Sequence, residues 1–206
     1  NGKLYGDKCK MKKVDPLMKE RYAEMLASPP LSFWYKQRLL EVFPVKIEKI
    51  EYFHPNTFTG SDNTDYLNCF EIFGGKQWDE VNFENLYLKY TQFLMLNEAG
   101  KLYYLPAFLN NFYDLKYSNL EYFTYFLGNL EDGFYVPSPD EIHEMSKSRN
   151  YVRRKDYSTF ESITPEQSKL VAVFLTNVAN LFPSNWHAAQ QAQAALTNYW
   201  GNFLLF

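Results

Sequence analysis

Residues 101–109, KLYYLPAFL, place a proline inside an apolar stretch of the chain. Just upstream, Asn97 is a favourable N-cap residue and Glu98 adds a negative charge to a first helical turn. The pattern therefore predicts a helix from about residue 98 to 113, kinked at Pro106 because proline removes one intrahelical donor. A membrane-dipping segment is not expected, since a spanning helix needs about 18 apolar residues without interruption.

Length and composition predict a protein with a large core. The chain has 206 residues, of which 46% are hydrophobic and 19% aromatic, and a chain of this size buries roughly 70% of its unfolded surface. Two cysteines, Cys9 and Cys69, are too few for a disulfide framework and favour reduced thiols in a cytoplasm. The sequence begins at Asn1 and leaves a removed leader open.

Apolar residues at helical spacing predict helices along most of the chain. The expected helices lie at about residues 15–28, 32–43, 64–73, 79–95, 118–130 and 185–200. In the second of them Trp34, Leu39, Leu40 and Phe43 form the inward set, and in the third Leu67, Phe70 and Phe73. Residues 45–53 read as a short strand. We expect a mainly α, single compact domain of seven or eight helices, with at most this one short β element.

The segment Thr164-Pro165-Glu166-Gln167 is the strongest local signal for a helix start. It matches a capping box with proline at the first helical position, and apolar residues follow at helical spacing up to Leu181. As domains, we expect a flexible basic N-terminus at 1–13 and one helical domain over 14–206, with a loop-rich insertion at about 131–163.

Charge along the chain predicts the kind of partner. The formal net charge is −3, yet residues 62–98 hold seven acids and two lysines, a local net charge of −5. This block, combined with an excess of tyrosine, favours a non-enzymatic interaction protein with a basic protein partner, for example an immunity protein that binds a toxin. The partner-binding residues we expect are Asp62, Asp65, Glu71, Trp78, Tyr103 and Tyr104.

An enzyme is the alternative prediction. His54, Asp62, Asp65 and Glu71 lie near one another in the sequence and could serve a metal-dependent or hydrolase-like enzyme. Their spacing matches no zinc or EF-hand pattern, and no nucleophile or phosphate-loop motif is present. We therefore expect no catalytic residues, no metal and no cofactor.

The basic cluster at 147–155 has two readings. Lys147, Arg149, Arg153, Arg154 and Lys155 alternate with tyrosine in the manner of a single-strand nucleic-acid patch. The negative overall charge argues against nucleic-acid binding held by phosphate contacts and favours a solvated loop.

Four ordered motifs carry a resemblance to a known family. They are E-I-F-G-G-K-x-W at 71–78, Y-Y-L-P-A-F-L at 103–109, T-P-E-Q at 164–167 and A-L-x-x-Y-W at 195–200. Together they resemble a bacterial family of domain-of-unknown-function type, over about residues 45–200. The resemblance implies a compact, mainly helical protein and supplies no catalytic residues. At position 70 it implies a more polar residue than Phe70.

Overall fold

Helix α5, which runs from Glu98 to Phe112, is buried on nearly every side. Asn97 caps it as predicted, because its Oδ1 accepts the backbone N–H of Gly100 at 2.8 Å. The helix continues through Pro106, which is buried within it; the degree of bending there stays a prediction. Tyr104, Leu105 and Phe108 are completely buried. A helix that is apolar all round lies at the centre of a fold, and α5 takes that place here.

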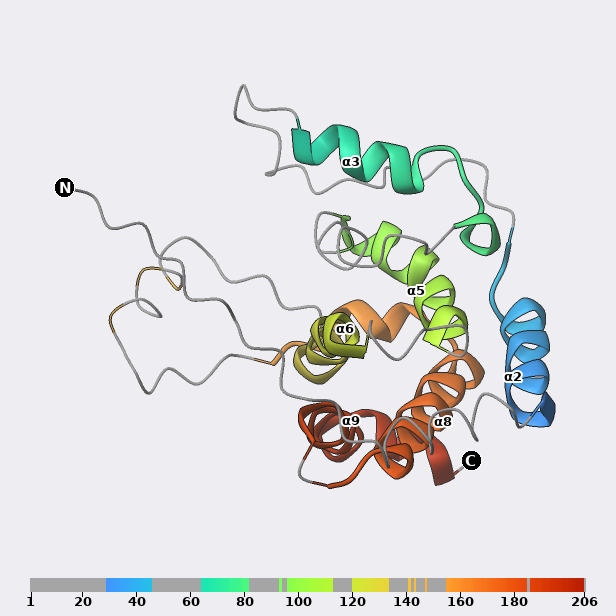
Figure 1. Cartoon of the computed structure of the whole chain (residues 1–206), viewed down its shortest axis with the longest axis vertical. Helices are drawn as coiled ribbons and strands as arrows, with labels where there is room; N and C mark the ends of the chain where they lie inside the picture. The colour runs from blue at the N-terminus through green and yellow to red at the C-terminus, as the bar shows by residue number, and fades with distance from the viewer. Residues whose placement is uncertain are drawn as a thin grey trace.

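The remaining elements surround α5 (Figure 1). The structure, a computed structural model, describes residues 29–45, 64–81, 93, 96–112, 120–133, 141, 143, 147, 155–184 and 186–205. Its helices are α2 (Pro29–Val42), α3 (Thr64–Phe73), α6 (Leu120–Asp132), α8 (Pro165–Leu181) and α9 (His187–Asn198), together with the 3₁₀ helices η2 (Trp78–Glu80), η4 (Ser158–Ser162) and η5 (Trp200–Leu205). The described residues form a compact helical domain without a β-strand, as predicted; residues 46–53 of the expected strand lie outside them.

The layers follow from the packing of these helices. Helix α9 packs against both α6 and α8, while α2 packs against α8 and α5. Figure 1 shows α3 at one side of the molecule and α8 with α9 at the other, with α5 between them. None of the described helices combines the length and the apolar composition that crossing a membrane requires.

Aromatic rings fill the space between α5, α6 and α8. Phe108 of α5 stacks on Phe126 of α6 with ring centroids 5.3 Å apart. Phe174 of α8 meets Phe112 of α5 edge-on at 5.3 Å and Phe123 of α6 at 5.6 Å. Tilted and edge-on ring pairs at such distances contribute beyond the area they bury. Much of the aromatic content is therefore used to build the core.

Helix α2 differs from the prediction in its start and its inward face. Pro29 and Pro30 are the first residues of α2, which begins three residues before the predicted start at 32, because proline is well tolerated in a first helical turn. The predicted helix at 15–28 lies outside the described residues. The buried stripe is Tyr35, Leu39 and Phe43, four residues apart, whereas Trp34 is 48% exposed and Leu40 is 43% exposed. The prediction was wrong for these two residues because both lie off this stripe.

The T-P-E-Q motif both starts α8 and attaches it to α2. Thr164 Oγ1 accepts the backbone N–H of Gln167 at 3.2 Å, and Gln167 Oε1 accepts that of Thr164 at 2.8 Å, so the predicted capping box is confirmed. Gln167 Nε2 also donates to the carbonyl of Val42 at the end of α2, at 3.1 Å. One local motif therefore also makes a long-range contact.

We expect Thr164→Ala to lower the free energy of unfolding by about 1 kcal/mol, because the first turn of α8 loses its side-chain acceptor. Urea denaturation measures the change. Thr164→Ser is the control, since it keeps the hydroxyl that accepts the Gln167 N–H, and it should restore most of the loss. Equal destabilisation by alanine and serine would mean that the threonine methyl, not the cap, carries the effect.

The A-L-x-x-Y-W motif attaches the C-terminal helices to α6. Trp200 is completely buried, and its indole Nε1 donates to the carbonyl of Leu130 at 3.1 Å. Its ring meets Phe160 of η4 at 4.5 Å. The neighbouring Tyr199 stacks on Tyr157 with nearly parallel rings 4.6 Å apart. Most of the predicted loop-rich insertion lies outside the described residues, but its last part is packed against the domain by these rings.

Candidate interaction site

Helix α3 presents two large apolar side chains to solvent. Leu67 is 59% exposed and Phe70 is 52% exposed, whereas Cys69 and Phe73 are completely buried. Residues advance by about 100° around a helix, so Leu67 and Phe73, six positions apart, lie about 120° from each other and cannot share a narrow inward face. The exposure of Leu67 and Phe70 shows that the prediction that both are buried was wrong. For Phe70, the polar residue that the family resemblance implied at position 70 was the signal that could have shown it.

We call Leu67, Phe70 and Glu71 the α3 face. Glu71 is exposed and follows Leu67 by four residues, so its carboxylate lies on the same side of the helix. The next element, η2, adds the exposed carboxylates of Asp79 and Glu80. Glu80 also accepts the backbone N–H of Gln77 at 2.8 Å, which holds it in the loop after α3. Residues 64–81 carry four acids and one lysine, a net charge of −3.

The single lysine of this segment, Lys76, caps the end of α3. The last four carbonyls of an α-helix have no partner inside the helix. Lys76 Nζ donates to those of Glu71 at 2.6 Å and Ile72 at 3.1 Å. Backbone N–H groups bond the other two, from Gly74 to Phe70 at 2.7 Å and from Lys76 to Phe73 at 3.1 Å. The positive charge of Lys76 is thus directed at the end of the helix, where it opposes the negative end of the helix dipole.

Two tyrosines of α5 bond to the segment that follows α3. Tyr104 lies with its hydroxyl 2.6 Å from the carbonyl of Phe73 and 3.0 Å from that of Lys76. Tyr103 donates to the carbonyl of Val45 at 2.6 Å, and its hydroxyl accepts the backbone N–H of Trp78 at 3.3 Å. The motifs F-G-G-K-x-W and Y-Y-L-P, about 25 residues apart in the sequence, therefore meet at one joint between α3 and α5.

The six predicted partner-binding residues have different positions. Glu71 is exposed, whereas Trp78, Tyr103 and Tyr104 are 2%, 8% and 0% exposed. Any contact of these three rings with a partner is therefore indirect, through the position they give to α3. Asp65 lies in the first turn of α3, and Asp62 lies outside the described residues. The sequence prediction missed Leu67 and Phe70 as exposed residues of the same segment.

The described residues do not assemble the alternative catalytic set. His54 and Asp62 lie outside them, and within them no three His, Cys, Asp or Glu side chains come close enough to hold a metal ion. Burial raises the pKa of the Cys69 thiol to about 12, so at neutral pH this thiol is protonated and unreactive. Of the four residues in the enzyme hypothesis, the structure thus describes two, Asp65 and the exposed Glu71.

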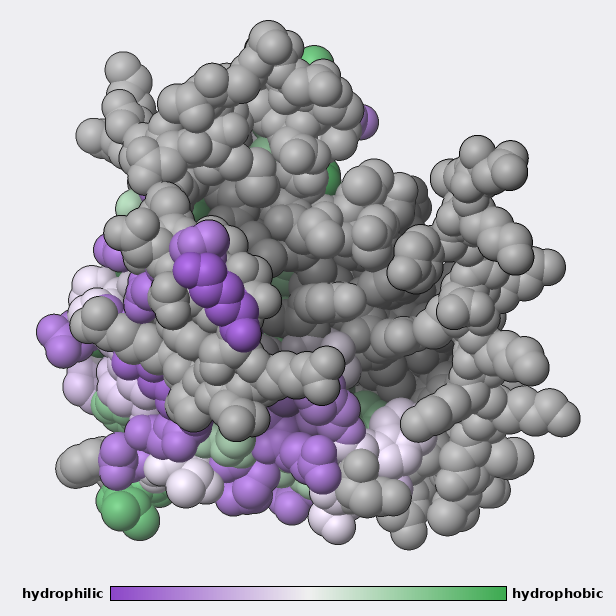
Figure 2. Space-filling view, turned by 90° about the vertical axis from the view of Figure 1, so that its left-hand side faces the viewer, coloured by the Kyte–Doolittle hydropathy of each residue, from purple (hydrophilic) through white to green (hydrophobic). Residues whose placement is uncertain are grey.

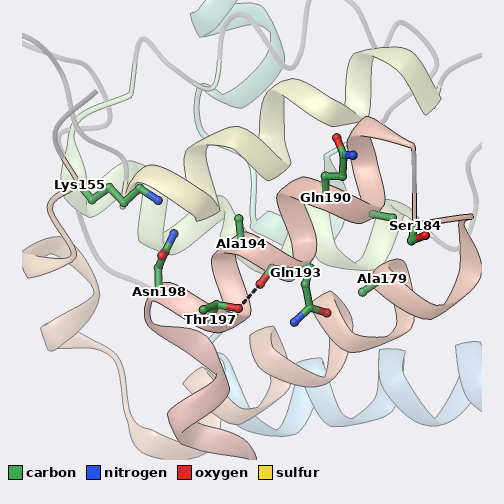
Figure 3. Close-up of a pocket in the computed structure, with 9 residues that line it drawn as sticks. Lys155, Ala179, Ser184, Gln190, Gln193, Ala194, Thr197 and Asn198 are labelled. Atoms are coloured by element: carbon green, nitrogen blue, oxygen red, sulfur yellow. Dashed lines mark hydrogen bonds between the residues drawn. The ribbon is translucent and has the colours of Figure 1, made fainter. Parts of the chain in front are cut away.

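A hollow lies between the end of α8 and α9. Ala179, Ala189 and Ala194 line it with apolar surface, and the polar residues around it are Lys155, Ser184, Gln190, Gln193, Thr197 and Asn198. In Figure 3 the hydroxyl of Thr197 points back to its own helix, where Oγ1 donates to the carbonyl of Gln193 at 2.9 Å. Among these lining residues there is no carboxylate, histidine or thiol, so they offer no acid–base pair.

The face of the molecule seen in Figure 2 contrasts with α3. Over the lower half of that view the described residues are mainly hydrophilic, and hydrophobic groups occur only as small separate areas. Scattered apolar groups of this kind are ordinary on a protein surface. Elsewhere in the described chain, large hydrophobic side chains are also exposed on α2 (Trp34 and Leu40) and on η5 (Leu204 and Leu205). We take the α3 face as the candidate interaction surface because its apolar pair lies beside the exposed carboxylate of Glu71.

The comparison with protein families shows which family the chain belongs to. The model of a family of unknown function, DUF6714, matches residues 69–204. Because this match covers more than half of the chain, the chain belongs to that family. No match was found among the curated proteins or among the solved structures.

Proposed function

We propose that this member of DUF6714 is a non-enzymatic interaction protein that binds a basic protein partner through the α3 face, as an immunity protein binds its toxin. The observation that carries the proposal is the exposure of Leu67 and Phe70 next to the exposed carboxylate of Glu71. Two apolar side chains with acidic residues around them have the composition of a small interface core with a charged rim. The same helix buries its other side, so the exposed side chains are held on an ordered element.

The charge of this segment supports a basic partner over an acidic one. Lys76 is the only cation among residues 64–81, and its Nζ is directed at the carbonyls of α3. With the charge of Lys76 included, residues 64–81 keep a net charge of −3, and the carboxylates of Glu71, Asp79 and Glu80 are exposed. Such a surface speeds the encounter with a positively charged protein and repels an acidic one. Phe70 supplies the apolar contact that a charged rim alone lacks.

Site-specific photocrosslinking tests the proposal. Phe70→benzoylphenylalanine is expected to form an adduct with one basic protein when the variant is irradiated in cells of its own source. The matched control is Trp34→benzoylphenylalanine, because Trp34 is an aromatic residue of α2 with a similar exposed fraction, 48% against 52% for Phe70. Adducts that are the same at both positions, or an acidic partner at position 70, would contradict the proposal.

The affinity for the captured partner then measures the contribution of the ring. Phe70→Ser is expected to weaken binding at least tenfold, which corresponds to about 1.4 kcal/mol. Trp34→Ser should leave the affinity unchanged. Since both side chains are about half exposed, neither substitution should greatly change the unfolding midpoint, which denaturation checks in parallel. An affinity that both substitutions leave unchanged would place the interface elsewhere.

A further inference from the structure

Helix α3 is attached to the described part of the domain mainly through its C-terminal end. Its last residue, Phe73, packs on Tyr104 at 4.7 Å and on Phe108 at 6.3 Å between ring centroids. One turn earlier Cys69 is buried, while Leu67 and Phe70 face solvent. In Figure 1 α3 extends along one side of the molecule, away from α8 and α9. The ring contacts between α3 and α5 thus lie in the last turn of α3, and a segment attached in this way can open locally without global unfolding.

The hydrogen bonds at this end come from α5. The hydroxyl of Tyr104 lies within bonding distance of the carbonyls of Phe73 and Lys76, on the two sides of the Gly74-Gly75 turn. Gly75 has a φ of 69°, the left-handed conformation that ends a helix. A phenol has one proton to donate, and here it is shared between the last carbonyl of the helix and the first one after the turn. The turn is thus fixed by a side chain from outside the helix.

We propose that α3 opens as a local unit, and that the Tyr104 hydroxyl is the latch that holds it closed. This inference rests on the proposed function in one respect: the latch sets the position of the α3 face and so regulates partner binding. Tyr104 is a positioning residue, because it is buried and acts through the Gly74-Gly75 turn. Loss of its hydroxyl leaves the Phe73 carbonyl with only the N–H of Lys76.

Hydrogen exchange under native conditions tests the latch. In Tyr104→Phe the ring still packs on Phe73, yet the amides of the last two turns of α3 are expected to exchange at least tenfold faster than in the parent protein. The matched control is Tyr35→Phe. Tyr35 is 1% exposed, and its hydroxyl also donates to one backbone carbonyl, that of Leu170 at 2.8 Å. In this control the α3 amides should exchange at the same rate as in the parent protein.

A second variant keeps the test decisive if Tyr104→Phe folds poorly. Lys76→Met removes the two bonds to the carbonyls of Glu71 and Ile72 and should produce the same selective acceleration in α3. Uniform acceleration of α3 and α8 amides in whichever variant folds would overturn the latch, because α3 would then open only with the whole domain.

The exchange measurement needs no partner, so it separates this inference from the proposed function. Selective opening of α3 in a protein that captures no basic partner would support the latch and contradict the function. If the partner of the crosslinking experiment is captured, Tyr104→Phe should weaken its binding at least threefold. Unchanged affinity together with a faster-exchanging α3 would overturn the regulatory part of the inference.

Discussion

Gly133→Ala is expected to lower the free energy of unfolding by roughly 3 kcal/mol or more. This is the larger of the two glycine-to-alanine effects that we predict. Gly133 follows the last residue of α6 and has a φ of 79°, which a residue with a Cβ adopts only at a cost. A Cβ at this position would also lie 2.0 Å from the carbonyl oxygen of Asp156 and 2.9 Å from the nitrogen of Tyr157. Conformational strain and a backbone clash therefore add.

The clash cannot be relieved by a small movement, because the segment at 155–157 is held against the end of α6. The backbone N–H of Asp156 donates to the carbonyl of Asp132 at 3.1 Å. Tyr157 donates its hydroxyl to the carbonyl of Glu131, and Lys155 pairs with the Glu131 carboxylate at 3.6 Å. Room for a methyl group would require breaking these contacts together.

Gly75→Ala is the matched control for this experiment. Gly75 also has a positive φ, 69°, but a Cβ there would have no atom within 4 Å. Gly75→Ala should therefore lower the free energy of unfolding only by the conformational strain of its positive φ, about 1 kcal/mol. Chemical denaturation of both variants beside the parent protein separates the two contributions. Equal losses would show that the close approach at Asp156 relaxes at little cost.

The start of α8 and the extent of α3 and α5 were predictable because their signals are local. Thr164 bonds Gln167 three residues away, and Asn97 caps α5 by the same geometry. These contacts form whatever the rest of the chain does. The Gly74-Gly75 turn likewise marked the end of α3 in the sequence. Helix existence and helix ends could therefore be predicted with the fold unknown.

The inward faces could not be predicted in the same way, since they depend on which element packs against them. In α2 the bond from Tyr35 to the Leu170 carbonyl of α8 turns Tyr35 inward and leaves its neighbour Trp34 exposed. In α3 the contact of Phe73 with Tyr104 turns Phe73 inward and leaves Leu67 exposed. Apolar character alone does not reveal such pairings, because Leu and Phe are common on surfaces too.

The same reason explains the outcome for the candidate site. The acidic Glu71 was placed correctly on the surface of α3, because a charged residue is seldom buried. Tyr103 and Tyr104 lie inside because each hydroxyl finds backbone partners in a segment distant in sequence. A tyrosine-rich sequence is compatible with both arrangements, and the long-range carbonyl partner is what distinguishes them.

Lys101→Met is expected to stabilise the protein near neutral pH by up to about 3 kcal/mol. Lys101 is 2% exposed near the start of α5, and burial lowers the pKa of its ammonium group to about 8, although the charge of Glu98 acts in the opposite direction. The ordinary value is 10.5. Keeping the buried group charged at pH 7 therefore reduces the stability of the folded state, and methionine fills a similar volume without that charge.

The pH dependence gives this prediction a sign that can be checked. Between about pH 8 and 10.5 the unfolded chain binds more protons at Lys101 than the folded protein does, so this lysine makes the free energy of unfolding rise with pH across that window. Below pH 8 its full penalty is present. Burial raises the pKa of Cys69 and of Tyr157 to about 12, and these groups act in the opposite direction at alkaline pH.

The difference between the parent protein and Lys101→Met isolates the lysine from those other groups. Denaturation at a series of pH values should show the variant more stable at pH 7, with an advantage that shrinks between about pH 8 and 10.5. Lys169→Met, which replaces an exposed lysine of α8, is the control for the loss of one positive charge at the surface. An advantage of Lys101→Met that stays constant across this range would mean that the buried amine titrates as it does in the unfolded chain, because only a shifted pKa makes the difference depend on pH.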